Sequence, residues 1–143
     1  MKNKRILSFL FAVVVLVGTS FSAFAALPPE STVSPLYIEA KNLSSSIAYS
    51  GDSAIAKATI STQSSCTVKV TLTIQSYSSA GWIDYATFPT QTVSTIASIP
   101  KSVSNTSYNI PDGYYRTSAY IEIYRNGVFV ESDTVTCSMK YKG

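Results

Sequence analysis

The feature that most constrains the fold of this chain is a ten-residue stretch, 66–75, in which polar and apolar side chains alternate without interruption. Cysteine, valine, leucine and isoleucine occupy every second position, and threonine, lysine and glutamine fill the positions between them. Successive side chains of a β-strand point to opposite faces, so this pattern predicts a strand with one buried face and one face in water.

Weaker alternation of the same kind runs through the rest of the chain after residue 35. It predicts strands at 43–49, 54–60, 82–88, 92–99, 103–110, 114–124 and 128–141, the last with a bulge near Ser132 or Asp133, and it allows a short edge strand at 36–40. Turns are expected at 50–52 and at 111–113, and Asn126-Gly127 is a strong hairpin signal. We expect a single all-β domain over 36–143, a sandwich of seven to eight antiparallel strands, with a small β-barrel as the alternative.

The N-terminal segment has the pattern of a secretory signal peptide. Positive residues come first, an apolar run at 6–17 follows, and Ala23-Phe24-Ala25 predicts cleavage between Ala25 and Ala26. The run is too short for a membrane-spanning helix, which needs about 20 residues. We expect a signal-peptide helix at 1–25, an extended proline-containing arm at 26–35, and a secreted, extracellular protein.

Charge and composition exclude several classes of function. The leader removes three of the 11 Lys+Arg residues, which leaves eight against eight Asp+Glu, so a neutral mature chain predicts no nucleic-acid partner. It also has no basic amphipathic helix for stable membrane insertion. The chain contains no histidine, which excludes a Ser-His-Asp triad and histidine metal ligands, and we expect no cofactor and no metal.

Several motifs resemble those of a group of small secreted Gram-positive bacterial proteins of unknown function. They are Gly51-Asp52-x-Ala54, the alternating 66–75 segment, Gly81-Trp82, the run Pro111-Asp112-Gly113-Tyr114-Tyr115-Arg116, and Asn126-Gly127. The resemblance implies an immunoglobulin-like β-sandwich and an extracellular setting, and it supplies no activity. Asp112-Gly113-x-Tyr115 is also similar to the tyrosine corner of such domains, although Thr117 stands where their second cysteine would follow.

Cys66 and Cys137 are the two cysteines, and export favours a disulfide between them. An immunoglobulin-like arrangement argues against the bond, because the two cysteine strands would run parallel with the cysteines toward opposite ends. Their Cα atoms would then exceed the disulfide limit of about 7 Å. The alternative is a pair of buried free thiols.

Carboxylate side chains could support catalysis or metal binding without histidine. Asp84 and Glu122 are candidates for the facing pair of a glycoside hydrolase, although both positions also fit the wet faces of strands. Asp112, Glu131 and Asp133 lack the spacing of a calcium loop. We therefore expect no catalytic residues and predict that the protein is not an enzyme.

Aromatic side chains are the remaining candidates. Tyr114, Tyr120 and Tyr124 share the expected outer face of one strand with Arg116 and Glu122, and Tyr77, Trp82 and Tyr85 lie in or beside the preceding loop and strand. Tyrosine combines a large, stiff contact area with a polar tip, which suits recognition of an extracellular protein or glycan. We therefore predict a secreted binding module, with a secreted antagonist, a structural matrix component and a small hydrolase as alternatives.

Overall fold

The computed structural model describes residues 38–143. The expected signal peptide, its cleavage point between Ala25 and Ala26, and the arm at 26–35 lie outside the described residues. The described part contains no helix and nine strands, where the sequence predicts seven to eight. They are β1 (Ala40–Ser50), β2 (Ser53–Thr62), β3 (Thr67–Ser78), β4 (Gly81–Thr87), β5 (Gln91–Ser94), β6 (Lys101–Ser107), β7 (Gly113–Arg125), β8 (Val128–Thr136) and β9 (Lys140–Lys142).

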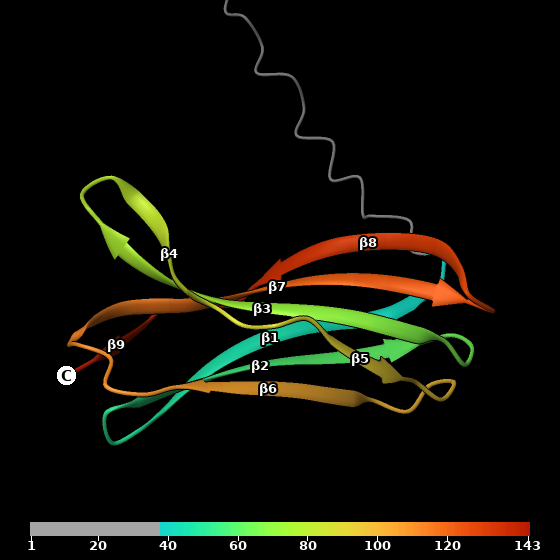
Figure 1. Cartoon of the computed structure of the whole chain (residues 1–143), viewed down its shortest axis with the longest axis horizontal. Helices are drawn as coiled ribbons and strands as arrows, with labels where there is room; N and C mark the ends of the chain where they lie inside the picture. The colour runs from blue at the N-terminus through green and yellow to red at the C-terminus, as the bar shows by residue number, and fades with distance from the viewer. Residues whose placement is uncertain (1–37) are drawn as a thin grey trace, which may run out of the picture. The chain divides into compact units, whose positions relative to one another are not determined.

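The strands form two antiparallel sheets that face each other (Figure 1). One sheet has the order β1-β2-β6, and the other has the order β4-β3-β7-β8, with β5 also paired to β3 and β9 to β7. Within 38–143 the sheets do not close on themselves, so the alternative prediction of a small barrel is wrong. The predicted pair of antiparallel sheets is confirmed.

The space between the sheets is filled by the apolar positions of the alternating segments. The face of β3 predicted to be buried is buried, and three alanines of β2 allow the opposite sheet to approach closely. The side chains with at most 1% exposure include Ile47, Ala54, Ala56, Ala58, Ile60, Val68, Val70, Leu72, Ile74, Ala119, Ile121 and Ile123. Period-two alternation therefore assigns the core correctly on four strands.

The turns and strand ends show where the pattern is less informative. Asn126 and Gly127 connect β7 and β8 with φ angles of 53° and 78°, as expected of a two-residue hairpin. Of the predicted strand at 36–40, the described residues 38 and 39 lie outside the strands, and Ala40 begins β1. The segment 76–81, between the predicted strands at 66–75 and 82–88, forms the end of a tight β3–β4 hairpin, in which Tyr77 lies opposite Trp82.

The C-terminal strand departs most from its prediction. It is interrupted after Thr136, and its end returns as the short strand β9 beside the start of β7. The predicted bulge exists, but it lies at Val130, which has no partner between Phe129 opposite Tyr124 and Glu131 opposite Ile123. Met139, which lies between these two strands, is 57% exposed.

A tyrosine fixes the entry into β7. The Tyr115 side chain is buried, and its hydroxyl donates a hydrogen bond to the Pro111 carbonyl oxygen at 2.9 Å. Burial raises the pKa of Tyr115, and the neighbouring Tyr85 adds to this effect. This hydrogen bond joins the β6–β7 connection to the beginning of β7, the strand that carries most of the predicted binding residues.

Candidate functional site

The outer surface of the larger sheet carries seven aromatic side chains, which we call the aromatic face. They are Tyr77, Trp82, Tyr114, Tyr120, Tyr124, Phe129 and Tyr141. Strand register places them together, because directly opposed residues of an antiparallel pair point the same way. Tyr77 lies opposite Trp82, and on the other edge Phe129 and Tyr141 lie opposite tyrosines of β7.

The aromatic face is open. Five of its seven side chains are between 43% and 59% exposed. In the described part of the chain, the smaller sheet packs only against the opposite, core-facing surface of the larger sheet. Exposed apolar side chains that gather on one surface mark interaction sites, whereas singly scattered ones do not.

Around Trp82, side chains hold one another in fixed positions. The Arg116 guanidinium carbon lies 4.2 Å from the centroid of the Trp82 ring, and the Tyr77 ring lies 5.2 Å from it. The Arg116 Nε donates to Gln75 Oε1 at 2.8 Å, and Gln75 Nε2 donates to Asp84 Oδ1 at 2.8 Å. Three planar polar groups are thus pre-ordered beside an indole ring, which lowers the entropy cost of binding a ligand there.

A second cluster lies farther along β7. Glu122 accepts hydrogen bonds from the hydroxyls of Tyr120 and Tyr124, at 3.4 and 3.3 Å. The Lys69 ammonium lies 4.8 Å from the Tyr124 ring centroid, and Phe129 meets the same ring edge-on at 5.7 Å. The two clusters place charged and aromatic groups at separate positions along one sheet surface.

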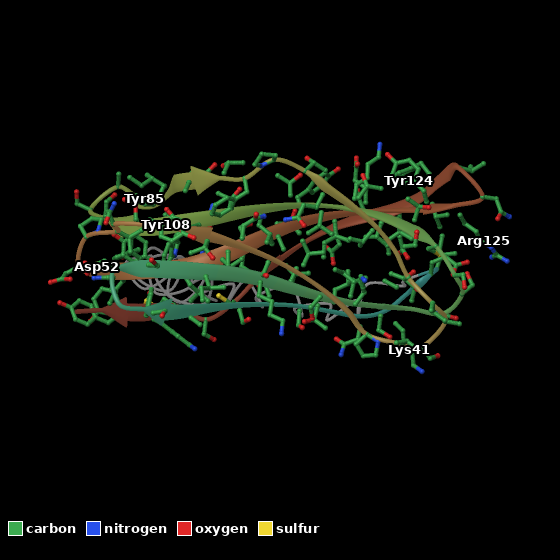
Figure 2. The ribbon with its side chains drawn as sticks, turned by 60° about the horizontal axis from the view of Figure 1, so that its bottom comes forward. Lys41, Asp52, Tyr85, Tyr108, Tyr124 and Arg125 are labelled. Carbon is green, nitrogen blue, oxygen red and sulfur yellow. The ribbon has the colours of Figure 1, made fainter. Side chains whose placement is uncertain are left out.

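Tyr85 does not belong to this face, although the sequence groups it with Tyr77 and Trp82. It has no partner in the β3–β4 ladder, because Ala86 lies opposite Ile74 and Asp84 lies opposite the next residue, Gln75. Its ring contacts the buried ring of Tyr115 at 5.6 Å, on the core side of the sheet. Figure 2 shows Tyr85 at the opposite end of the sandwich from Tyr124.

The hypothetical hydrolytic pair is far apart. Asp84 lies level with Arg116, because both are opposite Gln75, and Glu122 is six residues farther along β7. At about 3.3 Å per residue this separation is about 20 Å. Glycosidases need their two carboxyl groups within about 10 Å, so Asp84 and Glu122 do not form such a pair.

The cysteines lie far apart along the larger sheet. Both are free thiols: Cys66 immediately precedes β3 beside the end of β7, and the Cys137 sulfur accepts a hydrogen bond from the Thr117 backbone N–H at 3.1 Å. Thr67 lies opposite Tyr124, seven residues along β7 from Thr117, which corresponds to more than 20 Å. This spacing exceeds what a disulfide can bridge.

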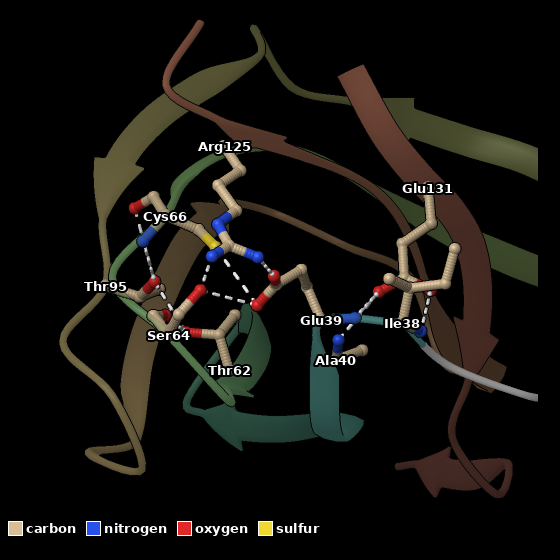
Figure 3. A network of polar contacts seen from close by, with 9 residues as sticks. All are labelled: Ile38, Glu39, Ala40, Thr62, Ser64, Cys66, Thr95, Arg125 and Glu131. Carbon is tan, nitrogen blue, oxygen red and sulfur yellow. Dashed lines mark hydrogen bonds and ion pairs between the residues drawn. The ribbon is translucent and has the colours of Figure 1, made fainter. Parts of the chain in front are cut away.

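Next to Cys66 is a buried carboxylate (Figure 3). The Glu39 side chain is 4% exposed, and it contacts Arg125 Nη1 at 2.6 Å and the Ser64 hydroxyl at 2.6 Å. The Ser64 hydrogen bond, assisted by Arg125, lowers the pKa of Glu39 against the opposing effect of burial. Because this carboxylate is buried, paired with Arg125 and hydrogen-bonded to Ser64, it is not exposed to a substrate.

Glu131 holds the beginning of β1. Its carboxylate accepts hydrogen bonds from the backbone N–H groups of Ile38, Glu39 and Ala40 at 2.7 to 3.1 Å (Figure 3). At the other end of the sandwich, Lys142 forms ion pairs with Asp112 at 3.2 Å and Asp52 at 3.6 Å. Asp112 and Glu131, two of the three carboxylates considered for calcium binding, therefore have structural partners. No cluster of three metal-ligating side chains occurs in 38–143.

Comparison with known proteins adds no identification. A scan against models of protein families finds no match, and no curated protein matches the sequence. Between residues 38 and 143 the structure has no helix long and apolar enough to cross a membrane. The candidate function therefore depends on the aromatic face itself.

Sequence reasoning finds part of this face and misses the rest. Tyr114, Tyr120 and Tyr124 share one surface with Arg116 and Glu122, as the parity of one strand predicts. The contributions of Lys69, Phe129 and Tyr141 were missed, because they come from neighbouring strands and depend on register. An even-odd pattern describes each strand singly and cannot give the pairing between strands.

Proposed function

We propose that this protein is a secreted, non-catalytic binding module that recognises an extracellular partner through the aromatic face. The observation that carries the proposal is the set of seven aromatic side chains on one open sheet surface, interspersed with ordered charged groups. Aromatic and arginine side chains dominate binding energetics, because they bury large areas with little loss of side-chain freedom.

We favour a glycan as the partner, with an extracellular protein as the second candidate. A sugar ring has a C–H face that stacks on an aromatic ring and hydroxyl groups at its edge that bond to planar polar side chains. Trp82, Arg116, Gln75 and Asp84 offer both kinds of group within one cluster. The exposed rings of the aromatic face are separated by charged side chains, whereas the centres of protein interfaces are depleted of charge.

The proposed scaffold is an immunoglobulin-like sandwich of the kind found in small secreted bacterial proteins. Its support is the pair of strand orders, β1-β2-β6 and β4-β3-β7-β8, which follows the A-B-E and C′-C-F-G order of such domains. The hydrogen bond from Tyr115 to Pro111 also has the position of a tyrosine corner, at the start of the strand equivalent to F.

A retention experiment tests the proposal. The full chain is expressed in an exporting host, and the recovered protein is incubated with insoluble wall glycans, with intact cells, and with immobilised extracellular protein. We compare the parent with a variant in which Tyr114, Tyr120 and Tyr124 are changed to serine. The matched control is Tyr108→Ser, because Tyr108 is 72% exposed and lies outside the aromatic face.

We expect retention on glycan by the parent and by Tyr108→Ser, and at least tenfold weaker retention by the triple variant. Retention on protein alone would replace the glycan by the second candidate. Equal retention of all three proteins would contradict the role of the tyrosines. Retention of none would favour the antagonist or matrix alternatives, for which cell-killing and concentration-dependent assembly are the assays.

A further inference from the structure

Two exposed tyrosines meet where the last strand joins the larger sheet. Tyr114 on β7 lies directly opposite Tyr141 on β9, and the two ring centroids are 5.0 Å apart with an angle of 54° between the ring planes. The side chains are 48% and 59% exposed, so both phenols are open to a small oxidant. Backbone pairing on each side of the contact holds the two rings together.

This pair differs from the other close tyrosines of the described chain. Tyr85 and Tyr115 lie 5.6 Å apart, but Tyr115 is only 3% exposed, and its hydroxyl is committed to Pro111. Tyr77 pairs with Trp82, which has no phenol. Within 38–143, the Tyr114–Tyr141 contact is therefore the close tyrosine pair whose two phenols are both accessible.

We propose that Tyr114 and Tyr141 are a site of oxidative cross-linking, at which a peroxide-driven one-electron oxidant joins the rings as dityrosine. Each phenol loses one electron and one proton, and the two phenoxyl radicals couple through the ring carbons beside their oxygens. The displaced ring hydrogens move to the oxygens and restore both phenols. Hydrogen peroxide takes up the two electrons and two protons and leaves as two molecules of water.

The cross-link would secure a strand that the fold holds by few contacts. Strand β9 pairs with β7 at three positions only, assisted by the Tyr49 hydroxyl bond to the Lys140 carbonyl oxygen at 2.8 Å and by the ion pairs of Lys142. A covalent bond between β7 and β9 closes a loop in the unfolded chain and so stabilises the folded state. A secreted protein meets oxidants without the reducing systems of the cytosol. The supply of oxidant therefore rests on the proposed secretion, whereas the ring contact does not depend on the proposed binding function.

The test treats the full chain, dilute enough to remain monomeric, with hydrogen peroxide and a haem catalyst. We expect monomer with the blue fluorescence of dityrosine, a mass lower by two hydrogen atoms, a higher Tm, and a cross-linked peptide that contains residues 114 and 141. Oxidation of the exposed Met139 adds an oxygen atom instead, so mass separates the two products.

Two variants make the result specific. Tyr141→Phe keeps the ring but has no phenol, and it should lose the monomeric dityrosine. Tyr108→Phe removes a more exposed tyrosine without a ring partner and should retain it. Dityrosine found only in dimers, or equally in Tyr141→Phe, would overturn the proposal. The peptide map of the parent decides the matter even if a variant does not fold, because it identifies the joined residues directly.

Discussion

The hydrogen bond from Tyr115 to the Pro111 carbonyl can be tested by removing a single oxygen atom. Tyr115→Phe keeps the buried ring and its contact with Tyr85, and loses only the hydroxyl. A typical intramolecular hydrogen bond contributes about 1 kcal/mol to the free energy of unfolding. Pro111 is exposed, so water can replace the lost donor, and the cost should stay near that value.

The expected shift in melting temperature follows from the size of the domain. At about 2.1 cal/mol/K per residue, about 106 described residues give an unfolding entropy of about 220 cal/mol/K. A loss of about 1 kcal/mol then lowers Tm by about 4 to 5 °C. Circular dichroism on heating measures this shift, and urea unfolding should give a lower midpoint with an unchanged slope.

The neighbouring tyrosine supplies the matched control. Tyr114 lies on the opposite face of the same strand, half exposed, and its ring contacts Tyr141. Tyr114→Phe should change the free energy of unfolding by less than about 0.5 kcal/mol, as is usual for surface positions. A Tyr115→Phe protein that melts within about 1 °C of the parent would refute the reasoning. An equal loss in Tyr114→Phe would assign the effect to phenol solvation generally.

The remaining predictions concern the thiols, a turn and two titrating groups. Unfolded but unreduced protein should give two reactive thiols per chain, and a count of zero in a protein that is monomeric without reductant would instead establish a disulfide between Cys66 and Cys137. Gly127→Ala should lower the free energy of unfolding in urea by about 1 kcal/mol, because φ is 78° there, and an unchanged midpoint would contradict this. Burial raises the pKa of Tyr49 from 10.0 to about 12, so its contribution to stability is present below pH 10 and is lost between pH 10 and about 12. Tyr49→Phe should decline less over that range in thermal melts. The lowered pKa of Glu39 acts in the opposite direction. The contribution of this carboxylate to stability is present above its ordinary pKa of 4.5 and is lost on acidification. Glu39→Gln should therefore lose less stability than the parent as pH falls.

The sequence predicts those parts of the fold that are determined within one strand or one turn. Alternation over 66–75 identifies the core face of β3, because burial of one face imposes it directly. Asn126-Gly127 predicts its hairpin because few other residues accept two consecutive positive φ angles. The break after Thr136 and the bulge at Val130 carry no comparable local signal, because pairing across strands decides them.

The candidate site was predictable in composition and not in arrangement. The parity of β7 groups Tyr114, Tyr120 and Tyr124 correctly, since all three lie on one strand. The contact of Trp82 with Arg116 depends on the irregular register of β4 at Tyr85, which places Trp82 and Asp84 on the aromatic face. Such an irregularity is a property of a strand pair, so reading one strand at a time assigned Tyr85 to the wrong group.

The placement of the first and last strands has a mechanical consequence. Ala40 begins β1 at the end where Glu131 grips the backbone, and Lys142 ends β9 at the other end, against Asp52 (Figure 1). A pull directed outward at both ends therefore runs along β1 and along β9, parallel to the strands. The hydrogen bonds of each ladder then share the load and must break together, unlike those of a hairpin peeled open from its tip. A module attached to a surface at one end and strained at the other would resist tension, with β9 and its three pairs as the first part to give way.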